Sequence, residues 1–78
     1  MSIANRIKNR RETLGATQRE LAKKAEVSYA SIQAYERGQI PKGDYLLAIA
    51  RALNCTTDWL LTGEEPVELF HEGRKEIG

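Results

Sequence analysis

The sequence predicts an all-α domain, a compact fold of five short helices over residues 1–63, followed by a tail at 64–78. Three observations lead to this fold class. Apolar residues recur at helical spacing in successive short segments, residues that cap helix N-termini precede most of these segments, and glycine or asparagine follows most of them. A chain of 78 residues forms one domain with a small core, which helices can fill without distant strand partners.

The first helix is expected to run from about Ser2, its N-cap, to Leu14, and Gly15 is placed to end it in a left-handed turn. Ile3, Ile7 and Leu14 share one helix face, so we expect them in the core. The basic residues at 6, 8 and 10 are expected to lie off this apolar face.

The second and third helices are short and are joined by a tight connection. Thr17 and Glu20 have the spacing of a capping box, which predicts a helix that ends near Ala25. Ser28 is the expected N-cap of the third helix, which ends at Gly38. Two short helices joined in this way are a candidate helix-turn-helix. The expected inward-facing positions of the pair are Leu21, Ala22, Ala25, Val27, Ile32 and Tyr35.

The fourth helix, expected from residue 43 or 44 to Leu53, is the most apolar and is therefore placed at the centre of the core. Asn54 stops it, Thr56 caps a short fifth helix and Gly63 closes that helix. From residue 64 onward the helical pattern fades, which indicates a tail or the start of a linker. The expected apolar face of the fourth helix consists of Leu46, Leu47, Ile49, Ala50 and Leu53.

Charge is divided unevenly along the chain. Residues 1–42 carry nine Lys/Arg and four Asp/Glu, a balance of +5, and residues 43–78 carry three and seven, a balance of −4, which together give the net charge of +1. A basic front half would orient the protein on a polyanion, although short segments also reach such an imbalance by chance.

Several classes of protein receive no support from the sequence. The single cysteine, Cys55, cannot form an internal disulfide and fits a reducing compartment. Because no signal peptide or membrane span is recognisable, we expect no membrane partner and a cytoplasmic location. No side chains have the spacing of a nucleophile with its base or of metal ligands, so neither an enzyme nor a metal or cofactor site is expected.

The outer face of the third helix indicates a function. This face carries little charge, whereas a solvated helix of its length usually carries more Lys and Glu. A DNA major groove admits one helix, in which a glutamine can pair bidentately with adenine and alanines can contact thymine methyl groups. The residues expected to contact bases are Ser28, Tyr29, Ala30, Gln33 and Ala34.

Phosphate contacts are expected around this helix. Gln18, at the start of the second helix, can bind a phosphate together with the free N–H groups of the helix end. Arg37 and Lys42 follow the third helix and could bind flanking phosphates, and Arg10 and Arg19 are weaker candidates for the same role.

Over residues 2–63 the sequence resembles the DNA-binding domains of lambda-type phage repressors and their Cro counterparts, of which the phage-434-type head is the nearest pattern. The resemblance implies a five-helix domain that binds a two-fold operator as a homodimer, with half-sites about one helical turn apart. It also implies that Gln18 both binds phosphate and braces the helices. The matching residues are Ser2-Ile3, Arg6-Ile7-Lys8, Arg11, Leu14-Gly15, Thr17-Gln18, Glu20-Leu21-Ala22, Ser31-Ile32, Tyr35-Glu36, Gly38, Ala52-Leu53-Asn54, Asp58-Trp59-Leu60-Leu61 and Gly63.

Two departures from that pattern matter. The base-reading stretch at 28–34 lacks the run of glutamines seen in the 434-type head, so its target sequence should differ. The turn position that is usually glycine is Glu26, and a left-handed backbone there would cost roughly 1 kcal/mol.

Arg11 and Glu36 form a predicted ion pair. Arg11 lies on the Ile7/Leu14 face of the first helix and Glu36 is next to the inward-facing Tyr35, so both point at least partly inward. The family resemblance suggests the same pairing.

The sequence therefore predicts a sequence-specific transcriptional repressor or regulator of phage or prophage origin. Activation through contact with RNA polymerase is a variant of this function, with a patch around Arg19 and Lys23. The expected dimer surface is the corner at residues 54–60. The alternative is a protein-interaction module, such as an antitoxin-like domain, that uses the same fold without DNA.

Overall fold

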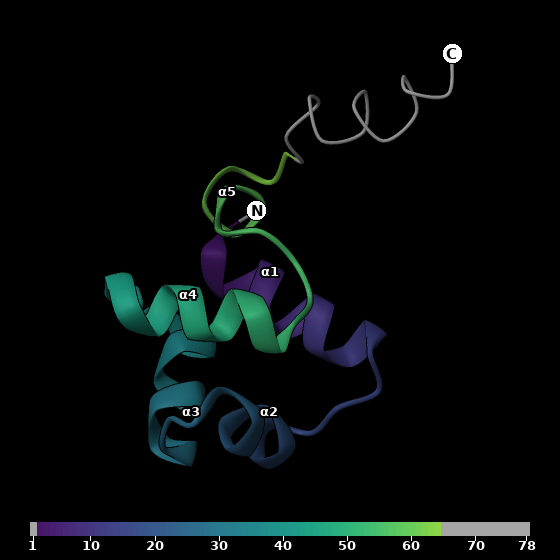
Figure 1. Cartoon of the computed structure of the whole chain (residues 1–78), viewed down its shortest axis with the longest axis vertical. Helices are drawn as coiled ribbons and strands as arrows, with labels where there is room; N and C mark the ends of the chain where they lie inside the picture. The colour runs from purple at the N-terminus through teal and green to yellow at the C-terminus, as the bar shows by residue number, and fades with distance from the viewer. Residues whose placement is uncertain (1, 65–78) are drawn as a thin grey trace.

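The computed structural model describes residues 2–64. Over this range the chain is all helical and contains no strand, which confirms the predicted fold class (Figure 1). The expected tail at 65–78 lies outside the described residues. The helices are α1 (Ile3–Thr13), α2 (Gln18–Ala25), α3 (Tyr29–Arg37), α4 (Gly43–Ala52) and α5 (Thr57–Thr62).

Four of the five helices begin at a hydroxyl side chain that accepts a hydrogen bond from the backbone three residues later. These caps are Ser2, Thr17, Ser28 and Thr56, all as predicted. At Thr17 the capping box is complete, because the Glu20 carboxylate accepts a bond from the Thr17 N–H at 2.8 Å. Such side chains satisfy backbone donors that a helix leaves unpaired in its first turn.

Several helices end in a residue with the left-handed backbone conformation, at the predicted glycines and asparagine and also at Glu26, for which this conformation is unfavourable. Gly15, Gly63 and Asn54 have φ of 74°, 84° and 57°. Glu26, between α2 and α3, has φ 59° and ψ 42°, which confirms a left-handed turn at a position without glycine. The turn is therefore strained, because the Cβ atom of a residue other than glycine lies too close to the following carbonyl oxygen in this region.

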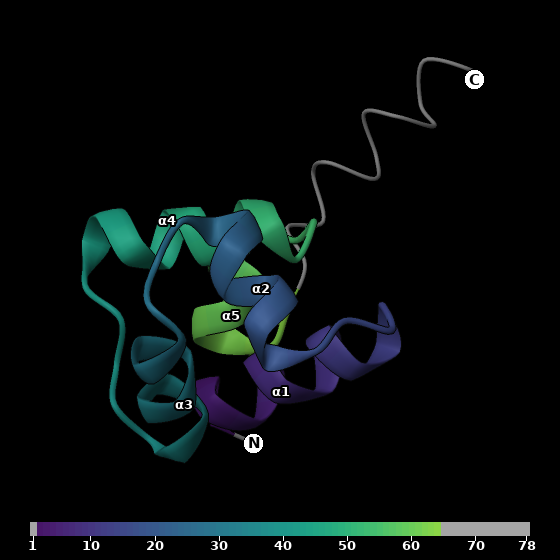
Figure 2. The ribbon, with the colours of Figure 1, turned by 90° about the horizontal axis from the view of Figure 1, so that it is seen from below.

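The core forms where the helices meet, and α2 and α4 each contribute three buried residues to it. In Figure 1, α4 and α1 cross the middle of the molecule, α2 and α3 lie together at one end, and α5 lies at the other end beside the N-terminus. In Figure 2, the view from below, α4 and α1 lie on opposite sides, and α2 overlaps α5, which Figure 1 places at the opposite end of the molecule. The buried hydrophobic residues are Ile7, Leu21, Ala22, Ala25, Ile32, Tyr35, Ile49, Ala50, Ala52, Leu53 and Leu60.

Two arginines of α1 face inward, contrary to the prediction that they lie off the apolar face. The buried Arg6 donates from Nε to the carbonyl of Leu60 at 2.8 Å and from Nη2 to that of Leu61 at 3.0 Å. Arg10 donates from Nε to Leu53 at 2.9 Å and from Nη2 to Asn54 at 3.0 Å. The carbonyls at helix C-termini lack intrahelical donors, so these guanidinium groups cap the ends of α5 and α4.

Two leucines predicted in the core are exposed instead. Leu14 is 45% exposed, because it is the C-cap of α1 and lies past the last turn that packs on the other helices. Leu47 of α4 is 44% exposed, because the buried face of that helix is narrower than its apolar sequence and is centred on Ile49 and Ala50.

Candidate nucleic-acid interface

The rotation of α3 about its own axis decides which of its side chains a partner can reach. Ile32 is fully buried and Tyr35 is 4% exposed, which confirms that these two residues anchor α3 to the core. The small Ala22 and Ala25 of α2 are buried as well. The opposite side of α3 therefore faces outward, at the end of the molecule where α2 and α3 lie together (Figure 1).

The base-contact candidates of α3 differ in how far they are available. Ala30 and Ser28 are exposed, and Gln33 and Ala34 are half-buried at the edge of the outer face. Ser28 Oγ already accepts a bond from the Ser31 N–H at 3.0 Å and donates to Ser31 Oγ at 2.8 Å, so its hydroxyl is occupied as a cap. Ser31 was not among the predicted base contacts. Its hydroxyl accepts the bond from Ser28, and no hydrogen bond within residues 2–64 uses its own proton, which is available to a partner.

Tyr29 does not stand clear of α3 as expected. Its ring is half-buried and packs against the core, and the guanidinium carbon of Arg19 lies 4.1 Å from the ring centroid. Arg19, predicted as a phosphate contact, is thus a stacking partner of a predicted base contact. The approach of a cation to an aromatic face at this distance is attractive.

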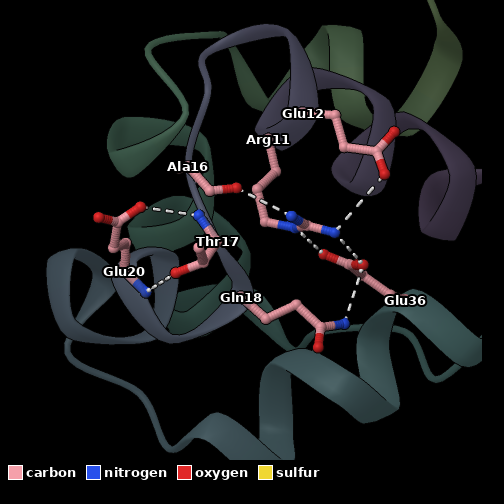
Figure 3. A network of polar contacts seen from close by, with 7 residues as sticks. All are labelled: Arg11, Glu12, Ala16, Thr17, Gln18, Glu20 and Glu36. Atoms are coloured by element: carbon pink, nitrogen blue, oxygen red, sulfur yellow. Dashed lines mark hydrogen bonds and ion pairs between the residues drawn. The ribbon is translucent and has the colours of Figure 1, made fainter.

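The predicted ion pair between Arg11 and Glu36 is present and joins α1 to α3 (Figure 3). Arg11 Nε donates to Glu36 Oε2 at 2.7 Å and Nη2 donates to Oε1 at 3.1 Å, the bidentate geometry that arginine favours. The two side chains are 11% and 5% exposed. Glu36 holds the pKa of Arg11 above its ordinary value, chiefly through the hydrogen bond.

Gln18 completes this network from α2. Its Nε2 donates to Glu36 Oε1 at 3.1 Å, and Arg11 Nη1 donates to the Ala16 carbonyl at 2.8 Å, just before α2 begins (Figure 3). One carboxylate on α3 therefore holds side chains of both α1 and α2. The helix-bracing role that the resemblance implied for Gln18 has a direct geometric basis.

The other expected phosphate contacts separate into two groups. Arg37 ends α3 and Lys42 precedes α4, and both side chains are exposed. Lys42 lines one surface hollow together with Ser28 and Ser31 at the start of α3. Arg10 is elsewhere, because its guanidinium bonds the carbonyls that end α4. The structure thus brings Gln18, Arg37 and Lys42 around α3 and places Arg10 in a capping role.

Nothing in residues 2–64 is both long and apolar enough to form a membrane-crossing helix.

Comparison with known proteins assigns the chain to a family. The sequence pattern of the helix-turn-helix family matches residues 7–60.

Named relatives share most of this chain. The HTH-type transcriptional regulator DicA of Escherichia coli (strain K12) is 41% identical over 66 residues, which are 83% of this chain and 49% of DicA. The repressor protein C2 of Salmonella phage P22 is 40% identical over 63 residues, which are 80% of this chain and 29% of C2. The chain thus spans about half or less of each relative.

A solved structure gives the same result. The P22 c2 repressor in complex with a synthetic operator superimposes with a TM-score of 0.79 at 38% identity, over 82% of this chain and 98% of that chain. This chain therefore belongs to the helix-turn-helix family, and its helices have the fold of the phage repressor DNA-binding domains.

Proposed function

We propose that this chain binds a specific double-stranded operator through α3 and thereby represses or regulates transcription, as a protein of phage or prophage origin. The observation that carries the proposal is the orientation of α3. Ile32 and Tyr35 anchor the helix from within, and a nearly uncharged outer face with Ala30 and Gln33 is left for base edges. The P22 c2 repressor, which has the same fold, is known in complex with an operator.

The roles of individual residues follow from this placement. Ala30, Gln33 and Ala34 are the proposed base-facing residues of α3, joined by Tyr29 and the Ser28–Ser31 hydroxyl pair at the helix start. Arg37 and Lys42 are the proposed phosphate contacts, because both are exposed cations beside that face. Gln18 braces α3 through Glu36, and the start of α2 can also meet a phosphate.

We also propose that two copies bind one operator. A single α3 reads only a few base pairs, and a two-fold operator read by two copies doubles that length. The proposed contact is the corner formed by residues 54–60 together with Leu61, which is 48% exposed on α5. This corner lies away from α3, so pairing there leaves both reading helices uncovered (Figure 1).

Selection of binding sites from random duplex DNA tests the proposal. The expected result is a two-fold sequence with half-sites about one helical turn apart, bound with a steep loss of affinity as salt rises. A duplex that contains one half-site should bind one copy, which sedimentation velocity would show. Absence of binding to any duplex, even at low salt, would overturn the proposal and favour a protein-interaction module on the same fold.

A further inference from the structure

Arg19 and Tyr29 form a stacked pair that links the start of α2 to the start of α3. Arg19 is the second residue of α2 and Tyr29 is the first residue of α3. The arginine side chain is exposed on α2, and its guanidinium carbon lies 4.1 Å from the centroid of the tyrosine ring. Arg19 has no acidic partner among residues 2–64, so the ring is its one defined contact there.

The stack holds Tyr29 while leaving its polar end unused. The ring packs against the core and also carries the guanidinium, so it has contacts with two parts of the protein. None of the hydrogen bonds within residues 2–64 uses the Tyr29 hydroxyl. A rigid ring with a free hydroxyl at the start of a reading helix has the properties of a base-reading group with little conformational freedom to lose.

Gln18, the residue before Arg19, makes a similar contact from α2 to the other end of α3. Gln18 bonds Glu36 in the last turn of α3, and Arg19 stacks on Tyr29 in the first turn. Gln33 is four residues after Tyr29 and three before Glu36, so all three share one flank of α3. Two consecutive residues of α2 therefore hold α3 on both sides of its principal candidate for base reading.

We propose that Arg19 is a positioning residue for base readout: by stacking on Tyr29 it fixes the direction in which the Tyr29 hydroxyl enters the groove. This proposal rests on the proposed function and assigns Arg19 a role in discriminating bases instead of binding phosphate. Lysine keeps the positive charge but lacks the planar group that stacks on a ring, so it should hold the ring less firmly than arginine does.

The test measures discrimination, defined as the affinity of the chain for its selected operator divided by its affinity for an operator changed at one base pair. The base pair is the one at which Tyr29→Phe, which keeps the ring and removes the hydroxyl, lowers discrimination. Arg19→Lys is expected to lower discrimination there by about two- to fivefold, the factor that matches an exposed cation–π contact. Combined with Tyr29→Phe, it should lower discrimination no further.

The control is Lys24→Ala, which removes another exposed cation of α2 and should leave discrimination unchanged. Urea unfolding confirms that each variant is folded at the assay temperature. Wild-type discrimination in Arg19→Lys, an additive loss in the double variant, or no base pair at which Tyr29→Phe has an effect would each overturn the positioning role. Failure of the wild-type chain to bind any duplex would instead overturn the proposed function.

Discussion

Replacing Glu36 by glutamine should destabilise the domain more than any other removal of a single charge. The Glu36 carboxylate accepts bonds from Arg11 Nε, Arg11 Nη2 and Gln18 Nε2, and only 5% of its side chain is exposed. The variant keeps the shape but leaves the Arg11 guanidinium, 11% exposed, with only the exposed and more distant Glu12 carboxylate as a counter-ion. Breaking a buried pair on one side costs about 3–5 kcal/mol.

We expect the lower end of that range, because the glutamine oxygen still accepts one bond and Arg11 keeps the Ala16 carbonyl. A loss of about 3 kcal/mol lowers the Tm of a domain of this size by about 12–24 °C. Urea unfolding followed by far-UV circular dichroism gives the free energy of unfolding, and thermal unfolding gives the Tm. Trp59 fluorescence, as a second probe, shows whether the transition is two-state.

Glu12→Gln is the matched control. Glu12 contacts the same arginine, with Oε2 at 4.0 Å from Nη2, but its side chain is 55% exposed. An exposed ion pair contributes about 0–1 kcal/mol, so this variant should unfold nearly as wild type does. Equal unfolding free energies for the Glu36 and Glu12 variants would refute the reasoning, because burial of a carboxylate would then not increase its contribution to the free energy of unfolding.

Four further substitutions have distinct expected outcomes. Glu26→Gly should raise the free energy of unfolding by about 1 kcal/mol by relieving the left-handed turn, and urea curves without that gain would mean that the turn is unstrained. Arg10→Met should lower the free energy of unfolding by about 1–3 kcal/mol, because two hydrogen bonds to backbone carbonyls are lost. It should leave the salt dependence of DNA binding unchanged, and a shallower salt dependence would mean that Arg10 contacts a phosphate. Gln33→Ala should cost about 1–3 kcal/mol of discrimination at one base pair per half-site in titrations of variant operators, and equal binding to all of them would remove Gln33 from the reading surface. Arg37→Ala should weaken binding to every duplex alike and reduce the slope of log affinity against log salt by about one, so a sequence-dependent loss would contradict a phosphate contact.

Caps and turns were the part of the fold that could be predicted from sequence, because each depends on residues within four positions of one another. Ser2, Thr17, Ser28 and Thr56 cap helices as expected, and of the two possibilities left open at Glu26, a left-handed or a differently shaped turn, the structure has the left-handed one. The inward position of Ile32 and Tyr35 on α3 was also predictable, because they are large residues at helical spacing, whereas Tyr29 was wrongly expected to stand clear of the helix.

The roles of Arg6, Arg10 and Arg19 could not be predicted in the same way. Arg6 and Arg10 occupy positions three residues after Ile3 and Ile7, which is the spacing of an inward face, but their charge argued for solvent. Their partners are the backbone carbonyls of residues more than 40 positions later, and any residue type can supply a carbonyl. The Arg19–Tyr29 stack could not be predicted for a related reason. No pattern in the sequence indicates how far a long side chain reaches across the turn between two helices.

The arginines of α1 and α2 have different roles: those of α1 stabilise the fold, and Arg19 of α2 is proposed to act in base readout. On α1, Arg6 bonds the end of α5, Arg10 the end of α4, and Arg11 the carboxylate on α3, so each joins this helix to a different later element. The bonds of these guanidinium groups to α5, to the end of α4 and to Glu36 join helices of the domain, so their loss should lower the free energy of unfolding without changing which base pairs are preferred. Arg19 contacts a residue at the start of the reading helix itself, and its loss should do the reverse. Measured well below the unfolding transition, the α1 variants should therefore keep the wild-type preference among operators even where their Tm has fallen most.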